Sequence, residues 1–497
     1  MLYKISRILL PVLIFSICFA CNKDDDNKEE QSVTSTINGE KFNPTKITIT
    51  LNNGYLIITL IEGSKKVEII TNNSITGNYG ITQEAFDGTS LLAQLTFMDS
   101  VTSYIGINGI LELTDEGFGV YSGSFSASVI SEELVTLEVN TIEFSDIELS
   151  TGIPIAETPE EFDLFLSSLY YDLARFFESA ILFDAVYTNY SQAPDNEWVD
   201  IYNHAQTSYD EKIYSFWDDA WRLINKTNYI LSAAEDFISN EEQLSVTLGQ
   251  ARASRAYVYY TLMIWFGELP LQLEPYAEQG SRHTLAEVMQ VIIEDALAAT
   301  YELPEEWPVP ENYKLNKGFA QSLLADIYLM NGSYEHVRMT TSNLLTGSTY
   351  YLGDDPFDYT ESNPEFIYGF TKSEGTEFGD FFTKGDYMPV VKLTKLVLAD
   401  IESNYNLGNL SDAIYQMNRL IVRRYGDDAS FQVTSINEED IYQAWMDEMN
   451  GEGINFAILK RFNKAVDSLG IEDYKLLLPV PERAILINPE LSQNPDY

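Results

Sequence analysis

The chain has 497 residues, 45% of them apolar and 13% aromatic, which is enough for two or three domains with well-packed cores. Its 76 acidic residues against 30 basic ones give a formal net charge of −46, which argues against nucleic acids and anionic membranes as ligands. With 32 tyrosines and 3 histidines, the composition favours aromatic contact surfaces over metal or acid–base chemistry, although tyrosine is also common in protein cores.

The first residues have the pattern of an export signal. Lys4 and Arg7 precede an apolar run over residues 8–20, which is short for a membrane span and is followed by acidic residues. We therefore predict a cleaved signal peptide over residues 1–20, with an uncleaved membrane anchor as the alternative. Cys21 follows small Ala20 as in a bacterial lipobox. Cys21 is thus the predicted site of lipidation, which would tether the protein outside the cytoplasm.

Residues 21–34 are polar and charged, which predicts a flexible acidic tether. The run Lys-Asp-Asp-Asp at 23–26 resembles the signal that sends Bacteroidetes lipoproteins to the cell surface, and a solvated spacer is the alternative. The other cysteine, Cys18, lies inside the predicted signal peptide. No disulfide is therefore expected within the mature chain.

Residues 35–150 alternate apolar and polar residues with the period of β-strands. Residues 47–51 and 55–61 flank an Asn-Asn-Gly turn, which predicts a β-hairpin. Further strands are predicted over residues 67–70, 91–97, 104–113, 119–129 and 135–142. Short strands separated by Gly, Asn and Asp predict an antiparallel β-sandwich over residues 35–150.

From residue 151 the apolar spacing changes to that of helices. Thr-Pro-Glu-Glu at 158–161 places an N-cap, a first-turn proline and a capping-box glutamate in order, so a helix is predicted from there toward Phe183. Thr284 and Glu287 repeat the capping box. Trp217 and Trp221 belong to a stripe with helical spacing, which should pack on a neighbouring helix.

The densest signal is the segment 251–270, which predicts a helix with one apolar face, a Gly267 cap and a stop at Pro270. That face holds Ala256, Tyr259, Tyr260, Met263 and Phe266. Two later segments place Gly332 before Val337 and Gly408 before Ala413, as in tetratricopeptide hairpins. Because these hairpins are not in tandem, we predict an all-α bundle of helical hairpins with insertions over residues 151–497.

Three motifs resemble the SusD/RagB family. The Arg-Ala-Tyr-x-Tyr-Tyr core and Phe-Gly-Glu-Leu-Pro ending within residues 252–275 are similar to its signature helix. The terminal Pro-x-Pro, Asn-Pro and Gln-Asn-Pro-Asp-Tyr within residues 479–497 resemble its C-terminal segment, with Asp496 where glycine is usual. A third motif is matched in part by Glu448, Glu452, Gly453 and Arg461, while Ala444, Trp445 and Asn455 depart from it.

The resemblance covers about residues 158–497 and implies a lipid-anchored outer-membrane protein with tetratricopeptide-like helices, exposed at the cell surface. Members of the family sit on a SusC-like TonB-dependent transporter and capture oligosaccharides, or in some branches peptides, for import. The resemblance therefore implies such a ligand, a SusC-like partner and membrane contact through Cys21. The helical part is short for the family and the β domain is outside its usual pattern, so the ligand and the role of residues 35–150 stay open.

A sugar site needs flat aromatic faces flanked by hydrogen-bonding side chains, because sugars are amphipathic and neutral. The first candidate is the loop 184–209, with Tyr187, Asn189, Tyr190, Asn196, Trp198 and Tyr202. Alternatively, Trp198 and Tyr202 begin the next helix and are packed. A second candidate combines Tyr351, beside Tyr350, with Phe382 and Tyr387, although aromatic residues that only anchor an irregular loop are favoured there. Trp307, framed by prolines, is a weaker third candidate.

Enzyme motifs are missing from the sequence: it has no zincin motif, nucleophile elbow, Walker loop or dinucleotide fingerprint. His204, His283 and His336 are isolated, each at a predicted surface or helix edge. We therefore predict a binding protein that is not an enzyme and has no cofactor or metal. A hydrolase with a binding domain, which needs only two carboxylates, is an alternative, as are a peptide-binding importer subunit and a structural adhesin.

Overall fold

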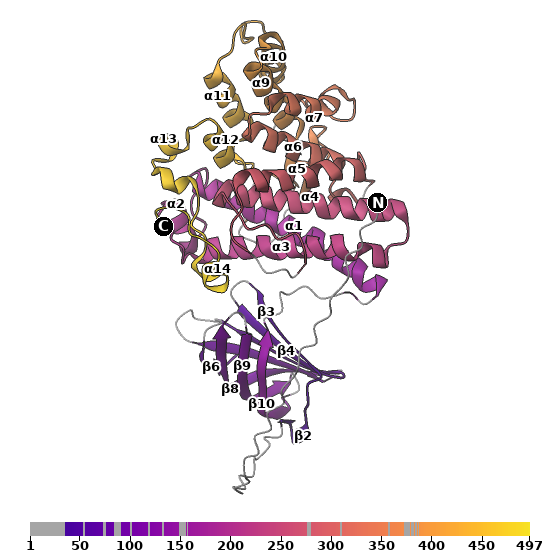
Figure 1. Ribbon diagram of the computed structural model, residues 1–497, viewed down its shortest axis with the longest axis vertical. Coiled ribbons are helices and arrows are strands. Elements are labelled where there is room, and N and C mark those ends of the chain that lie inside the picture. The colour runs from indigo at the N-terminus through magenta and orange to yellow at the C-terminus, as the bar shows by residue number, and fades with distance from the viewer. Residues whose placement is uncertain are drawn as a thin grey trace, which may run out of the picture.

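The structure is a computed structural model that describes residues 35–52, 55–72, 76–83, 91–99, 102–117, 120–131, 134–148, 156, 158–275, 280–308, 311–355, 358–371, 378, 382, 385 and 387–497. The predicted signal peptide, the lipidation site and the acidic tether lie outside the described residues. Figure 1 shows the N-terminal strands gathered in one body and the helices in another. The prediction of a β domain followed by a helical domain is confirmed.

The β domain is a single 10-stranded sheet in the order β2-β1-β10-β9-β8-β6-β7-β5-β4-β3. Each pairing of these strands is antiparallel, except that β6 runs parallel to β7. β3 also lies close to β10, so the sheet curls back on itself. The strands are β1 (Thr36–Ile37), β2 (Glu40–Lys41), β3 (Lys46–Asn52), β4 (Tyr55–Glu62), β5 (Lys65–Thr71), β6 (Gly77–Ile81), β7 (Leu92–Asp99), β8 (Thr102–Gly117), β9 (Val120–Ser131) and β10 (Thr136–Glu148).

The predicted hairpin is present, with Asn52 of β3 opposite Tyr55 of β4. Buried Ile58 and Leu60 alternate with less buried neighbours, as the period of two predicts. One continuous curled sheet takes the place of the two stacked sheets expected of a sandwich. Alternation identifies the buried face of each strand, but it does not tell whether a second sheet or the far end of the same sheet covers that face.

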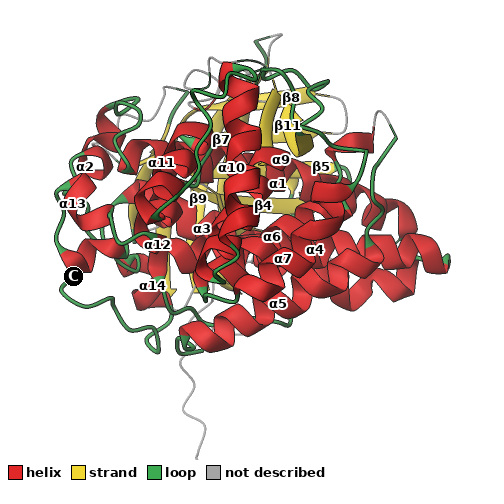
Figure 2. Cartoon of the chain, turned by 90° about the horizontal axis from the view of Figure 1, so that it is seen from above, coloured by secondary structure: helices red, strands yellow, loops and turns green. Residues whose placement is uncertain are grey.

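The helices pack on one another largely in chain order. Neighbouring pairs run α3 with α4, α4 with α5, α5 with α6, α6 with α7, α7 with α9, and α9 with α10, as Figures 1 and 2 show. The longer helices are α1 (Pro159–Tyr187), α3 (Glu211–Phe237), α4 (Glu241–Phe266), α5 (Leu285–Glu302), α6 (Lys317–Met330), α7 (Tyr334–Thr346), α9 (Leu393–Asn406), α10 (Leu410–Tyr425) and α11 (Glu438–Met449). The shorter ones are α2 (Val199–Tyr202), α12 (Asn455–Arg461), α13 (Ala465–Leu469) and α14 (Glu482–Ile487).

Both predicted helical hairpins are confirmed. Gly332 turns the chain between α6 and α7 with φ of +70°, and Gly408 does so between α9 and α10 with φ of +80°. Val337 and Ala413, the small apolar residues that follow the turns, are both fully buried. The capping box of Thr284 and Glu287 is also present, at the start of α5. These local signals were therefore sufficient to place the hairpins.

The signature helix α4 lies at the centre of the helical part. Its C-terminal half is buried on all sides and not on one face only, since Leu262 and Trp265 are buried as well as Tyr259 and Met263. Arg255 forms a bidentate ion pair with Asp295 of α5, with N···O distances of 2.7 and 2.8 Å. This ion pair thus joins α4 to α5.

The C-terminal segment closes over the end of α4. Asn494 Nδ2 donates to the carbonyl oxygens of Phe266 and Leu478, at 3.0 and 2.6 Å. Gly267 ends α4 with φ of +78°, so the predicted glycine stop is confirmed. Asp496 has φ of +66°, a conformation in which glycine is least strained. The terminal motif therefore has a structural role, since it holds the C-terminal segment against the end of α4.

Asp184 of α1 holds the start of α12, and this contact predicts a pH dependence. Its carboxylate accepts hydrogen bonds from the backbone N–H groups of Asn455 and Phe456, at 3.0 and 2.8 Å. Burial nevertheless raises the pKa of Asp184 from 3.8 to about 7, because the ionised form loses water. Its contribution to stability is therefore largest below about pH 4 and is lost as the pH rises through about 7.

We expect the unfolding free energy of the wild type to fall between pH 5 and pH 8 relative to that of Asp184→Asn, which has no titrating group at this position. Urea denaturation of both proteins, followed by tryptophan fluorescence, measures the difference. Parallel pH profiles of the two proteins would contradict the assignment.

Candidate functional site

A groove of about 650 Å³ lies between the connection from α5 to α6 and a short hairpin of β11 (Phe366–Thr371) and β12 (Tyr387–Lys392). Its aromatic lining residues are Trp307, Tyr350, Phe366, Tyr368 and Tyr387. They come from three stretches that are far apart in the sequence. The groove has the size and the apolar surfaces of a small-molecule or oligosaccharide site.

The aromatic side chains are held in place before any ligand binds. Trp307 Nε1 donates to the carbonyl oxygen of Leu315 at 2.8 Å, which fixes the indole plane. Phe366 and Tyr387 stack across the hairpin, with ring centroids 5.8 Å apart and an interplanar angle of 19°. A ligand that stacks on these rings would therefore meet preorganised surfaces and lose little affinity to their ordering.

The polar lining residues are Glu306, Asn312, Asn316, Glu361 and Ser362. Asn316 is already engaged, because it caps α6 and donates to the carbonyl oxygen of Ile367. Asn312 Nδ2 donates to Glu361 Oε1. Glu306, Glu361 and Ser362 are exposed and can accept hydrogen bonds from a ligand. The groove therefore combines aromatic faces with acceptors for hydroxyl groups.

Burial and nearby carboxylates raise the pKa values of two tyrosines in the groove. Burial, and then the carboxylates of Glu306 and Glu305, raise the pKa of Tyr350 to about 12. Burial and Glu361 also raise the pKa of Tyr387. Both phenols are therefore neutral hydrogen-bonding groups at physiological pH.

The second and third sequence candidates meet in this groove. Tyr387, Tyr350 and Trp307 all line it, although the sequence favoured a purely structural role for the second candidate. Tyr351, with 60% of its surface exposed, is outside the lining. Phe382 is 2% exposed and packs face to face with Phe378, so it offers no surface to a ligand in this structure.

The first candidate, the loop after α1, is largely packed. Tyr187 is fully buried at the end of α1 and Trp198 is 4% exposed, with its ring edge-on to Phe183. Tyr202 is half-buried and accepts a hydrogen bond from Gln192. Asn189, Tyr190 and Asn196 are exposed. The alternative that Trp198 and Tyr202 belong to the next helical turns and pack there describes the structure better.

Tyr190 lies directly over Gly451, which yields a prediction for this loop. Gly451 has φ of +80°, and a Cβ atom there would lie 2.2 Å from the Tyr190 ring. We expect Gly451→Ala to displace Tyr190 and to lower the unfolding free energy by about 1–3 kcal/mol, since it combines strain with a steric clash. Urea denaturation measures this loss, and Gly470→Ala is the control because it shares a positive φ but has open space around it. Equal losses for both variants would show that backbone strain alone is responsible.

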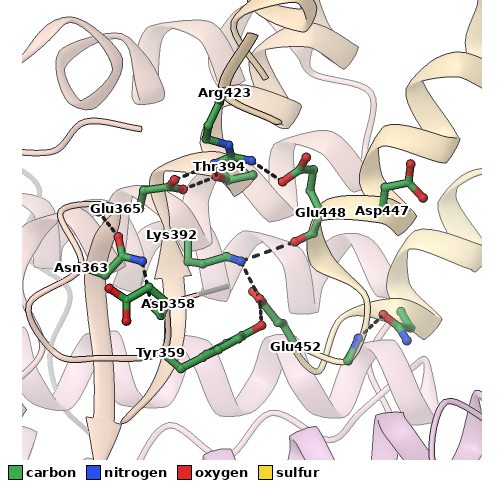
Figure 3. Close-up of polar contacts among 12 residues, drawn as sticks. Asp358, Tyr359, Asn363, Glu365, Lys392, Thr394, Arg423, Asp447, Glu448 and Glu452 are labelled. Atoms are coloured by element: carbon green, nitrogen blue, oxygen red, sulfur yellow. Dashed lines mark hydrogen bonds and ion pairs between the residues drawn. The ribbon is translucent and has the colours of Figure 1, made fainter. Parts of the chain in front are cut away.

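A buried ion network joins the start of β11 and the end of β12 to α10 and to the end of α11 (Figure 3). Arg423 of α10 pairs with Glu365, next to Phe366, and with Glu448 of α11. Lys392, at the end of β12, pairs with Glu452 at 2.5 Å, and both side chains are almost fully buried. Tyr359 donates to the same Glu452 carboxylate at 3.0 Å. The third family-like motif therefore fixes the hairpin that carries three of the groove's aromatic residues, Phe366, Tyr368 and Tyr387.

The sequence did not point to Glu365, Lys392 or Arg423, because their partners are distant along the chain. Glu448 and Glu452 were noticed only as part of a motif, without a role. A buried Lys or Arg is identified as a partner only when the fold brings a carboxylate to it.

His204 packs against the end of α1. His204 is buried, which corrects its predicted surface position, and its Nε2 lies 2.7 Å from the carbonyl oxygen of Tyr187. The described residues contain no group of three or more His, Cys, Asp or Glu side chains placed to hold a metal ion. Within the same residues, no helix has both the length and the apolar composition of a bilayer span.

Comparison with known proteins agrees with this architecture. Residues 145–329 match the family model SusD-like_3, described as "Starch-binding associating with outer membrane". Over that stretch, which is less than half of the chain, the sequence is similar to this family. A curated relative, SusD-like protein P2 of Formosa agariphila, is 22% identical over 126 residues. That match spans only a quarter of this chain and a quarter of the relative.

Solved SusD-like structures match the helical domain over their whole length. A "Laminarin binding SusD-like protein" has a TM-score of 0.59 at 16% identity, and covers 69% of this chain and 100% of its own. A SusD superfamily protein from Bacteroides vulgatus has a TM-score of 0.58 at 20% identity, with 69% and 100% covered. One from Bacteroides thetaiotaomicron has 0.58 at 17% identity, with 68% and 100% covered. The resemblance found in the sequence is therefore confirmed, and the β domain lies outside the shared fold.

Proposed function

We propose that this SusD-like protein binds an oligosaccharide in the groove beside β11 and β12 and delivers it to a SusC-like TonB-dependent transporter. The observation that carries the proposal is the groove itself, which is lined by preorganised rings and by hydrogen-bond acceptors. Sugar rings stack their apolar C–H faces on aromatic side chains, while their hydroxyl groups need polar partners. The family model, described as starch-binding, supports the same ligand class.

The protein would act as a non-enzymatic receptor, anchored in the outer membrane at the cell surface through a lipid on Cys21. The family's stated association with the outer membrane supports this location. The β domain, over about residues 35–150, would serve as a spacer or accessory module between the anchor and the receptor. Metabolic labelling with a palmitate analogue tests the anchor: label is expected on the wild type and lost in Cys21→Ala.

Calorimetry of the purified mature protein against neutral oligosaccharides of different linkages tests the proposed ligand. We expect at least one linkage type to bind. After incubation with the protein, that oligosaccharide should show no new reducing ends, because it is bound and not hydrolysed. Turnover that is abolished by a single Asp or Glu substitution would favour a hydrolase. Binding of peptides and of no glycan would favour a peptide-importing subunit.

A further inference from the structure

The groove is acidic. Glu306 and Glu361 are among its lining residues, and the described lining contains no lysine or arginine. Glu361 is held in position by its hydrogen bond from Asn312. The carboxylates are exposed to the groove and not buried in the core. A ligand in the groove therefore lies close to two negative charges.

Two lysines of the α5–α6 connection and the start of α6, Lys314 and Lys317, do not reverse this charge, because each is paired with its own carboxylate. Lys314, whose Nζ lies 4.8 Å from the Trp307 ring, pairs with Glu311 at 2.7 Å. Lys317 pairs with Glu305 at 2.6 Å. The charges of Lys314 and Lys317 are thus balanced by Glu311 and Glu305. The negative charges of Glu306 and Glu361 therefore remain in excess around the groove.

Two carboxylates in the groove act in opposite ways on two classes of glycan. Hydroxyl groups of an uncharged sugar can donate charge-assisted hydrogen bonds to them, and these are stronger than hydrogen bonds between neutral groups. A carboxylate or sulfate on the sugar would instead be repelled, because like charges at short distance repel each other even where water is present.

We propose that Glu306 and Glu361 determine specificity, so that the groove accepts uncharged oligosaccharides and rejects uronic-acid and sulfated ones. This inference rests on the proposed oligosaccharide site. It assigns the discrimination between uncharged and anionic glycans to two named residues, which the description of the family as starch-binding does not do.

The test compares a neutral oligosaccharide that binds with the same oligosaccharide oxidised at C6 to the uronic acid. For the wild type in low salt, we expect the oxidised form to bind at least about tenfold more weakly, and the gap to shrink as salt screens the repulsion. The double variant E306Q/E361Q should bring the two forms within about threefold of each other. Glu235→Gln removes an exposed carboxylate from α3, outside the groove, and should leave the gap unchanged.

Equal binding of the neutral and oxidised forms by the wild type would overturn the inference while leaving the proposed site intact. A gap that persists in E306Q/E361Q would overturn it as well, because the discrimination would then come from other groups. If no neutral oligosaccharide binds at all, the proposed function itself fails.

Discussion

Trp307→Ala is expected to weaken oligosaccharide binding by about 2 kcal/mol, or roughly 30-fold in Kd, because it removes the largest flat surface of the groove. The fold should tolerate this change. The carbonyl oxygen of Leu315, which accepts from Trp307, also accepts from Gln250 at 2.6 Å and so keeps a partner. Calorimetric titration gives the affinity, and an unchanged thermal midpoint shows that the loss is local.

Two adjacent tyrosines provide a matched control. Tyr350 lines the groove, whereas Tyr351 is 60% exposed and lies outside it. Tyr350→Ala should therefore weaken binding by about 1–2 kcal/mol, and Tyr351→Ala should leave it within about twofold. If Tyr351→Ala were the more damaging change, the ligand would bind elsewhere than in this groove.

Arg423→Met is expected to lower the unfolding free energy by about 3–5 kcal/mol, because it leaves buried carboxylates without their shared cation. Arg423 donates to Glu365 at 2.6 Å and also pairs with Glu448, and all three side chains are 5% exposed or less. Glu448 retains Arg424 at 2.9 Å, so Glu365 should account for most of the loss. Urea denaturation followed by tryptophan fluorescence measures the change.

Fluorescence suits this measurement because all 6 tryptophans lie in the helical domain. The control is Lys464→Ala, which breaks an ion pair with Glu439, 2.8 Å long, and should leave the unfolding free energy almost unchanged because both partners are exposed to solvent. A loss below about 1 kcal/mol for Arg423→Met would mean that the network relaxes or admits water. The β11–β12 hairpin would then not depend on the ion pairs of Arg423 for its stability.

Short sequence motifs, such as helix caps and turn glycines, predicted most of the helices and strands. They did not predict which residues line the groove. The capping box at Thr284 and the glycines at 332 and 408 act over a few residues, so they could be recognised without the fold. The β11–β12 hairpin was not predicted, since its strands are short and contain Gly369 and Pro389. Tyr187 was selected as an aromatic residue near a loop, yet its position at the last turn of α1 directs it into the core.

By itself, the sequence determined the change from strands to helices, the helical hairpins and the family resemblance, because each depends on periodicity or on motifs within a short stretch of chain. Only the tertiary structure decided that the strands form one curled sheet and that Trp307, Tyr350 and Tyr387 share a groove. It also decided which charges are paired, as with Arg423 and Glu365. Burial and charge pairing depend on contacts between distant segments, and a one-dimensional pattern does not contain them.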